Sequence, residues 1–201
     1  MSVRLLLCAL VAASASLPVT AVTSADAPVP HGLGLATRKG PAAPSRDVLL
    51  ATLVQTHTDE RVLLDATLPN EARFASLLSD RVTGSTTEMD PRLLNLLRRL
   101  AEKHRADAGA VRIELVSGFR SPKLNEMMRK KGHHVASRSR HSLGHAVDFR
   151  IVMPGETKGI DPRTLEREIR ELGWDGGLGI YTLEHDWFVH ADVGPRRGWS
   201  G

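Results

Sequence analysis

Two histidines and one aspartate form a candidate metal-binding set in this sequence. His141 and Asp148 are seven positions apart, and His190 follows further along the chain. Two imidazoles and one carboxylate are ligands typical of zinc, and three protein ligands leave a position open for water or substrate, which makes a site catalytic rather than structural. The set therefore predicts a catalytic zinc centre if the fold brings the residues together. If it does not, they are three unrelated surface or core residues.

The elements that must position these residues alternate between helices and strands, which indicates the α+β class. Asn70 and the pairs Asp90-Pro91, Ser121-Pro122 and Asp161-Pro162 are favoured helix starts. The predicted helices span about residues 70–79, 91–109, 121–131 and 161–172. The predicted strands are 48–56 and 61–68, as a hairpin, then 111–116, 146–152, 178–181 and 188–193. We expect one compact domain with a central antiparallel sheet that carries the zinc residues, flanked by helices.

The N-terminal region has the pattern of an export signal followed by a linker. Arg4 precedes a short apolar run, which is too short to span a bilayer and fits a secretory signal peptide. We therefore expect residues 1–25 to be a signal peptide. Residues 26–46 are rich in proline and glycine and are expected to be a linker. The working domain is then 47–201.

Composition narrows the chemistry further. The chain has 201 residues and one cysteine, Cys8, so it cannot form an internal disulfide, a zinc ribbon or an iron–sulfur site. The formal net charge is +4, and much of the positive charge lies between residues 120 and 140. With only 4 Phe, 3 Trp and 1 Tyr, the chain has no interleaved stacking pattern for nucleic acid. An anionic peptide or cell-wall polymer suits the basic segment better, and nucleic acid is not expected as a partner.

Residues Ser139 to Asp148 fit the pattern S-x-H-x-x-G-x-A-x-D. This segment resembles the zinc D-Ala-D-Ala metallopeptidase superfamily (peptidase M15-like), which contains carboxypeptidases, dipeptidases and murein endopeptidases. The segment Ser117–Pro122 resembles another motif of the same superfamily. Four segments resemble its MepK-like branch of exported murein endopeptidases: the hairpin turn His57–Glu60, the helix start Asp90–Leu94, Gly177–Tyr181 and Phe188–Trp199. The resemblance covers roughly residues 47–200 and implies a fold of the hedgehog or D-Ala-D-Ala peptidase type.

The resemblance implies one zinc ion per chain on His141, Asp148 and His190. It also implies that Arg120 holds a substrate carboxylate or stabilises the oxyanion that forms during peptide hydrolysis. Ser139 is expected to orient a metal ligand rather than to act as a nucleophile.

The general base is the point at which the sequence departs from the superfamily. Relatives often carry an acidic residue three positions before the last zinc histidine, and here that position is Trp187. Asp192 is the preferred candidate, because it points to the same face of a strand as His190. It is expected to act either as the base or as a partner that orients a ligand. The remaining candidates are Asp186, His185 and Glu184.

The expected function is zinc-dependent hydrolysis of peptide bonds in peptidoglycan stem peptides or cross-links, outside the cytoplasmic membrane. Two alternatives share the same residues. One is a D,D-carboxypeptidase or dipeptidase, and the other is a non-catalytic module that binds zinc or cell wall. No membrane span is expected once the signal is removed.

Overall fold

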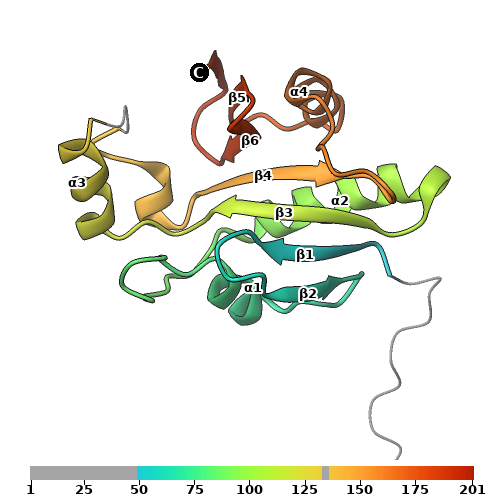
Figure 1. Ribbon diagram of the computed structural model, residues 1–201, viewed down its shortest axis with the longest axis horizontal. Helices are drawn as coiled ribbons and strands as arrows, with labels where there is room; N and C mark the ends of the chain where they lie inside the picture. Colours follow the sequence, from blue (N-terminus) through green and yellow to red (C-terminus); the bar gives the residue numbers. More distant parts are fainter. Residues whose placement is uncertain (1–48, 133–135) are drawn as a thin grey trace, which may run out of the picture. The chain divides into compact units, whose positions relative to one another are not determined.

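A seven-stranded sheet organises residues 49–132 and 136–201, the part of the chain that the computed structural model describes (Figure 1). The strand order is β2-β1-β3-β4-β6-β5-β7. The strands are β1 (Ala51–Gln55), β2 (Arg61–Leu64), β3 (Val111–Ser117), β4 (Ala146–Val152), β5 (Gly177–Leu183), β6 (Asp186–Asp192) and β7 (Arg197–Ser200). The helices are α1 (Glu71–Leu77), α2 (Pro91–Ala108), α3 (Pro122–Lys130), α4 (Pro162–Glu171) and the short 3₁₀ helix η1 (Arg140–Leu143). The expected signal peptide and linker lie outside the described residues.

The sheet is mixed, so the expectation of a purely antiparallel sheet was wrong. β1 pairs in parallel with β3, and β5 pairs in parallel with β7, while the other neighbours are antiparallel. The first parallel pair arises because α1 and α2 carry the chain from β2 back to the side of β1, where β3 enters. The second arises from β7, which the sequence did not predict because its four residues show no alternation of apolar and polar side chains.

The predicted helix starts are confirmed, and each helix is capped at its N-terminus by the expected side chain. Asn70, Asp90, Ser121 and Asp161 each accept a hydrogen bond from a backbone N–H in the first turn of the helix that follows. The last three helices carry proline at their first position. Within the described residues, no helix has both the length and the apolar character needed to cross a membrane.

The hydrophobic core lies on one face of the sheet, under α2 and α4. Figure 1 shows α2 behind β3, and the buried leucines of α2 belong to one cluster with apolar residues of β3, β4 and β6. On β4 these residues are Val147, Phe149 and Ile151, and on β6 they are Val189 and Ala191. Side chains alternate between the two faces of a strand. The residues between these positions therefore point to the opposite face, away from the core.

Gly144 fixes the turn from η1 into β4. Its φ of 69° lies in the left-handed region, and its carbonyl accepts a hydrogen bond from the Asp90 backbone N–H at 3.0 Å. A Cβ at this position would overlap the carbonyl of Glu88. Glycine is therefore required here for two reasons, the backbone conformation and the close approach of another segment.

Replacing Gly144 by alanine is predicted to destabilise the protein by about 2–4 kcal/mol, because it adds a steric overlap to the cost of a left-handed alanine. Gly155→Ala is the matched control. Gly155 has a φ of 83°, but a Cβ there would meet nothing within 4 Å, so only about 1 kcal/mol is expected. Urea denaturation of both variants measures the difference, and equal losses would contradict the role of the Glu88 contact.

Candidate metal centre

The three predicted metal ligands lie together on the sheet face opposite the core. Asp148 on β4 and His190 on β6 are directly paired across the two strands. His141 reaches them from η1. Their nearest ligand atoms are Asp148 Oδ1, His141 Nε2 and His190 Nδ1, which are separated by 2.7 to 3.3 Å. All three residues are buried, at 9% exposure or less.

In each imidazole one ring nitrogen forms a hydrogen bond with a protein oxygen, and the other ring nitrogen faces the cluster. His141 Nδ1 lies 2.7 Å from the carbonyl of Gly118 and donates to it, which leaves Nε2 facing Asp148. His190 Nε2 lies 3.1 Å from Asp192 Oδ2, which leaves Nδ1 facing the cluster. Metal-bound histidines commonly donate their second N–H in this way. Two such imidazoles and one carboxylate fit a zinc ion by the chemistry of the donor set.

The electrostatics of the cluster favour an ionised Asp148. Burial raises the pKa of Asp148, but the charges and hydrogen bonds of His141 and His190 outweigh burial and hold this pKa well below its usual range. For His190, burial lowers the pKa, and the hydrogen bonds and charges of Asp148 and Asp192 raise it to about 9. The carboxylates and the imidazole therefore stabilise one another in their charged forms.

Asp192 contacts the outer edge of His190, on a different side of the ring from Asp148. Its side chain is fully buried and accepts hydrogen bonds from Gly194 N at 2.7 Å and from Arg197 Nη2 at 2.6 Å. Arg197 Nη1 adds a second contact at 3.2 Å. Burial raises the pKa of Asp192, whereas these partners and His190 lower it to about 2. Asp192 is thus a charged group anchored behind His190.

Two glycines of β5 make room for this arrangement. Gly177 and Gly179 are paired across the ladder with Asp192 and His190. A Cβ at Gly177 would overlap the Asp192 carboxylate, and a Cβ at Gly179 would overlap the ring of Trp199. The Trp199 ring lies 5.1 Å from that of His190, between centroids. The glycines therefore admit Asp192 and Trp199 to the same sheet face as the cluster.

Arg120 lies beside the cluster as a buried guanidinium. Its backbone N–H donates to the carbonyl of His141 at 3.2 Å, and the residue is only 8% exposed. Burial lowers the pKa of Arg120, while the charge of Asp148 acts in the opposite direction. Among residues 49–132 and 136–201, its side chain has no hydrogen bond or ion pair. Ser139 is also buried, but its hydroxyl is not hydrogen-bonded to any of the three candidate ligands.

The other candidate bases lie away from the cluster. Glu184 and His185 form the turn between β5 and β6, and Asp186 begins β6, four residues before His190 or about 13 Å along the strand. His185 is exposed and lies 3.5 Å from Asp186. Trp187 Nε1 donates to the carbonyl of Gly159 at 2.9 Å. None of these residues contacts the metal-facing atoms.

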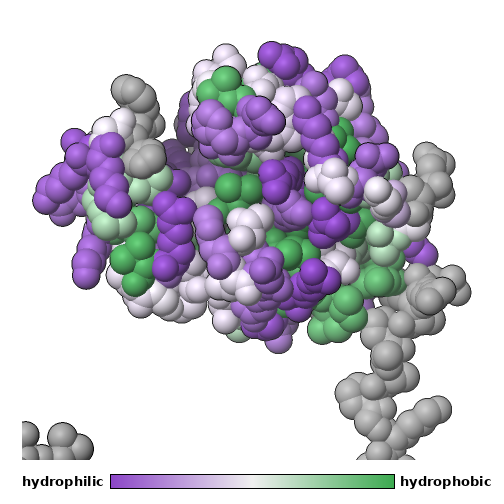
Figure 2. Space-filling model, viewed as in Figure 1, coloured by the Kyte–Doolittle hydropathy of each residue, from purple (hydrophilic) through white to green (hydrophobic). Residues whose placement is uncertain are grey.

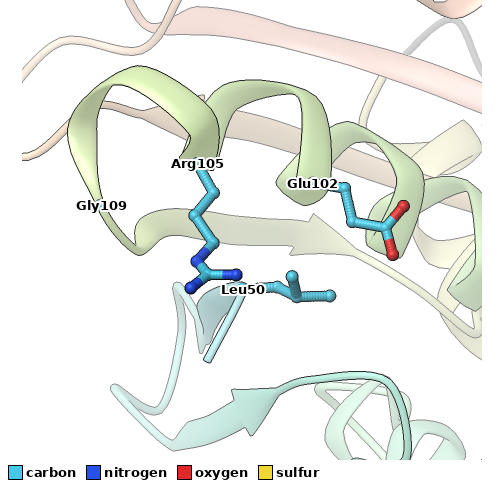
Figure 3. A pocket seen from close by; sticks show the side chains of 4 residues that line it. All are labelled: Leu50, Glu102, Arg105 and Gly109. Atoms are coloured by element: carbon cyan, nitrogen blue, oxygen red, sulfur yellow. The ribbon is translucent and has the colours of Figure 1, made fainter. Parts of the chain in front are cut away.

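A hollow on another part of the molecule is unrelated to this centre (Figure 3). Leu50, Glu102, Arg105 and Gly109 line it, between the end of α2 and the start of β1. It contains none of the candidate ligands or bases.

Comparison with known proteins identifies the family. Residues 51–199 match the family described as peptidoglycan L,D-endopeptidase MepK. The chain belongs to this family. The resemblance of the sequence to the MepK-like branch is therefore confirmed. No solved structure matches the chain.

Two relatives in the MepK family show the extent of the similarity. The probable peptidoglycan L,D-endopeptidase MepK of Haemophilus influenzae is 33% identical over 129 residues, which are 62% of this chain and 61% of the relative. The peptidoglycan L,D-endopeptidase MepK of Escherichia coli K12 is 34% identical over 87 residues, 43% of each chain. The chain thus matches about three fifths of the first relative's length and two fifths of the second's.

Some residues of this MepK-family site were not found from the sequence. Arg197 carries no local signal, because it follows another arginine in a segment without periodicity. Gly177 and Gly179 do carry one, since glycines at alternate positions in a strand indicate a close approach of other groups on one face. Trp199 and these three residues all lie in the segments Gly177–Tyr181 and Phe188–Trp199 that carry the resemblance, but the resemblance implied no role for any of them.

The charged cluster predicts how stability depends on pH in protein treated with a chelator. The pKa of His190 is about 9 in the folded protein against 6.5 ordinarily, so its contribution is complete below pH 6.5 and is lost as the pH rises through 9. Asp192 and Asp148 have lowered pKa values, so their contribution is complete above about pH 4 and is lost toward pH 2.

Stability should therefore be greatest between about pH 4 and 6.5 and fall by roughly 1–3 kcal/mol up to pH 9. Urea denaturation across this range measures the effect. His190→Gln should abolish the alkaline decline, and a decline that survives in this variant would exclude His190 as its cause.

Proposed function

We propose that this chain is a zinc-dependent murein endopeptidase that hydrolyses peptide bonds in stem peptides or cross-links of peptidoglycan. The observation that carries the proposal is the convergence of His141, Asp148 and His190, with each imidazole oriented through its second nitrogen. The relatives are named peptidoglycan L,D-endopeptidases, and these names supply the proposed substrate class and type of bond.

The three residues would hold zinc through His141 Nε2, Asp148 Oδ1 and His190 Nδ1. Bound zinc would supply a polarised peptide carbonyl and a water molecule of lowered pKa. The Gly118 carbonyl and Asp192 orient the two imidazoles so that His141 Nε2 and His190 Nδ1 face the cluster, and the Nδ1 proton of His190 would be released when a metal binds.

Arg120 is proposed to bind the substrate carboxylate or the oxyanion. A buried guanidinium without an anionic partner among the described residues is costly, and an anionic ligand would offset that cost. Its rigid fork of donors suits either group. Ser139 is proposed to orient the ligand His141 through the backbone of η1, since its carbonyl accepts from Ser142 N at 3.1 Å.

Asp192 is proposed to position His190 rather than to act as the general base. Its oxygens already accept from His190, Arg197 and Gly194, and it meets the ring edge that faces away from the cluster. A group that is this fully bonded is poorly suited to accept a proton from substrate water.

Export is part of the proposal, because peptidoglycan lies outside the cytoplasmic membrane. A signal peptide at residues 1–25 would deliver the domain at 47–201 to the periplasm or the cell wall. With Cys8 removed along with the signal, the mature chain would contain no thiol.

The decisive variant is His141→Ala, compared with His185→Ala as a matched control. His141→Ala is predicted to lose bound zinc and at least 100-fold of muropeptide digestion, because it removes a ligand from the cluster. His185 is exposed in the β5–β6 turn, so its removal should change neither. Zinc analysis and chromatography of muropeptide digests measure both, and equal digestion by His141→Ala and the wild type would refute the proposal.

Mass spectrometry of products from a defined cross-linked muropeptide separates the alternatives. An endopeptidase cuts an internal peptide bond and divides the compound into two fragments, whereas a carboxypeptidase or dipeptidase releases a terminal residue or dipeptide. Binding to sacculi without any released fragment would identify a non-catalytic module.

Asp192→Asn tests the positioning role, with Asp186→Asn as the control. Removing the charge behind His190 should weaken zinc binding by about 10–100-fold, since partners of metal ligands typically contribute this much. Asp186 lies in the β5–β6 turn region, so its variant should bind zinc normally. Competition with a chromophoric chelator gives the affinities. Unchanged zinc affinity together with a lost kcat would instead assign Asp192 as the base.

A further inference from the structure

Arg81 and Arg120 belong to neighbouring segments, and the charges of their side chains act on one another. The segment that contains Arg81 runs alongside the segment of Arg120, because Phe119 N donates to Leu78 O at 2.8 Å and Ser121 N donates to an oxygen of Asp80 at 2.6 Å. Phe119 and Ser121 are the residues on either side of Arg120, and Asp80 is the residue before Arg81. The two guanidinium groups are therefore brought to the same region from different parts of the chain.

His57 completes a group of three side chains that can carry positive charge. Arg81 Nη1 lies 3.4 Å from His57 Nε2, and the same ring nitrogen lies 3.1 Å from the carbonyl of Val116. One ring nitrogen cannot accept a hydrogen bond from Arg81 and donate one to Val116 at the same time. If His57 donates to Val116, the Arg81 Nη1 donor near it has no acceptor in His57 and is available to a ligand.

In the described part of the chain no carboxylate forms an ion pair with this group, although the charges of Asp148 and Asp80 act on Arg120. Among the described residues, neither Arg81 nor Arg120 forms an ion pair. Asp80 is close, but its oxygens already accept from the backbone N–H groups of Val82, Thr83 and Ser121. Burial has the largest effect on the pKa of Arg120 and lowers it, the charge of Asp148 opposes burial, and the smaller effect of the charge of Arg81 acts in the same direction as burial.

A tight turn holds the backbone of Arg81. Gly84 N donates to Asp80 O at 2.8 Å, Asp80 N donates to Ser85 O at 2.8 Å, and the Asp80 side chain caps the turn from inside. Its pKa of about 2 reflects these bonds, which outweigh the opposing effect of burial. An exposed arginine on a fixed backbone loses less conformational freedom when it binds an anion than one on a mobile loop.

We propose that Arg81, with His57 beside it, forms an anion-binding subsite next to Arg120 that holds a free carboxylate of the substrate peptide near the bond to be cleaved. This inference rests on the proposed function, because it specifies the acidic character of the peptide that the same site cleaves. Arg120 and Arg81 would engage two separate anionic groups, one at the reacting bond and one beside it.

The surface around the subsite has the charge to attract such a peptide. The exposed side chains of Lys123, Arg129 and Lys131 belong to α3 or to its end, which follows Arg120 directly, and no ion pair neutralises them among the described residues. Figure 2 shows hydrophilic side chains over α3. A positive surface of this kind raises the local concentration of anionic ligands and acts more weakly at high salt.

The test compares Arg81→Gln with Arg99→Gln on two substrates, using the full zinc-loaded chain. Arg99 is an exposed residue of α2 without an ion pair among the described residues, so its variant makes the same change of charge away from the site. The substrates are a defined cross-linked muropeptide and the same compound with its free carboxylates converted to amides. Arg81→Gln should lower kcat/KM about tenfold on the acidic substrate, mainly through KM, and leave the amidated substrate unaffected.

Arg99→Gln should match the wild type on both substrates. Equal kcat/KM for Arg81→Gln and Arg99→Gln on the acidic substrate would overturn the inference while leaving the proposed function intact. If the wild type cleaves neither substrate, the proposed function fails, and calorimetric titration with the acidic and amidated peptides decides the subsite separately. An approximately tenfold weaker Kd for the acidic peptide in Arg81→Gln alone supports the subsite, and equal Kd values in all three proteins reject it.

Discussion

The pairing of Asp148 with His190 across β4 and β6 is the constraint on which the candidate metal centre depends. Side chains that are directly opposite on neighbouring antiparallel strands lie close together, so the register alone brings a carboxylate and an imidazole within reach. A shift of one residue in either strand would turn one of them toward the core. The apolar residues that alternate with them are packed under α2 and α4, and this packing holds the register in place.

The remaining parts of the centre act on this pair from two sides. His141 is brought to it by η1, whose exit through Gly144 is fixed by contact with the segment before α2. On the other side, Asp192 and Arg197 occupy space left by Gly177. Buried charges are tolerable only when they are paired and hydrogen-bonded, and each of these charged groups meets that condition. Arg120 differs from them, because its buried side chain forms no hydrogen bond or ion pair among the described residues.

Much of this arrangement could be predicted from the sequence, because the signals were local. The helix starts at Asp90, Ser121 and Asp161 depend on capping residues next to proline, and the three ligands depend on residue type and a dense motif. The parallel pairing of β1 with β3 and of β5 with β7 could not be predicted, because it depends on contacts between distant segments. The contact of Arg197 with Asp192 could not be predicted either, because it depends on where β7 joins the sheet. For Asp192 the alternation along the strand predicted the correct face, but it could not predict which edge of the His190 ring the carboxylate contacts.

The position of β7 has a consequence for the order in which the centre is assembled. Arg197 and Trp199 lie on this strand, which joins the sheet at β5 and follows every other element along the chain. A polypeptide that emerges with its N-terminal side first can form the β1–β3–β4 part of the sheet before these residues are available. Arg197, which anchors Asp192 behind His190, would then be added last, so that the competence to hold a metal would arise late in folding, after the greater part of the core has formed.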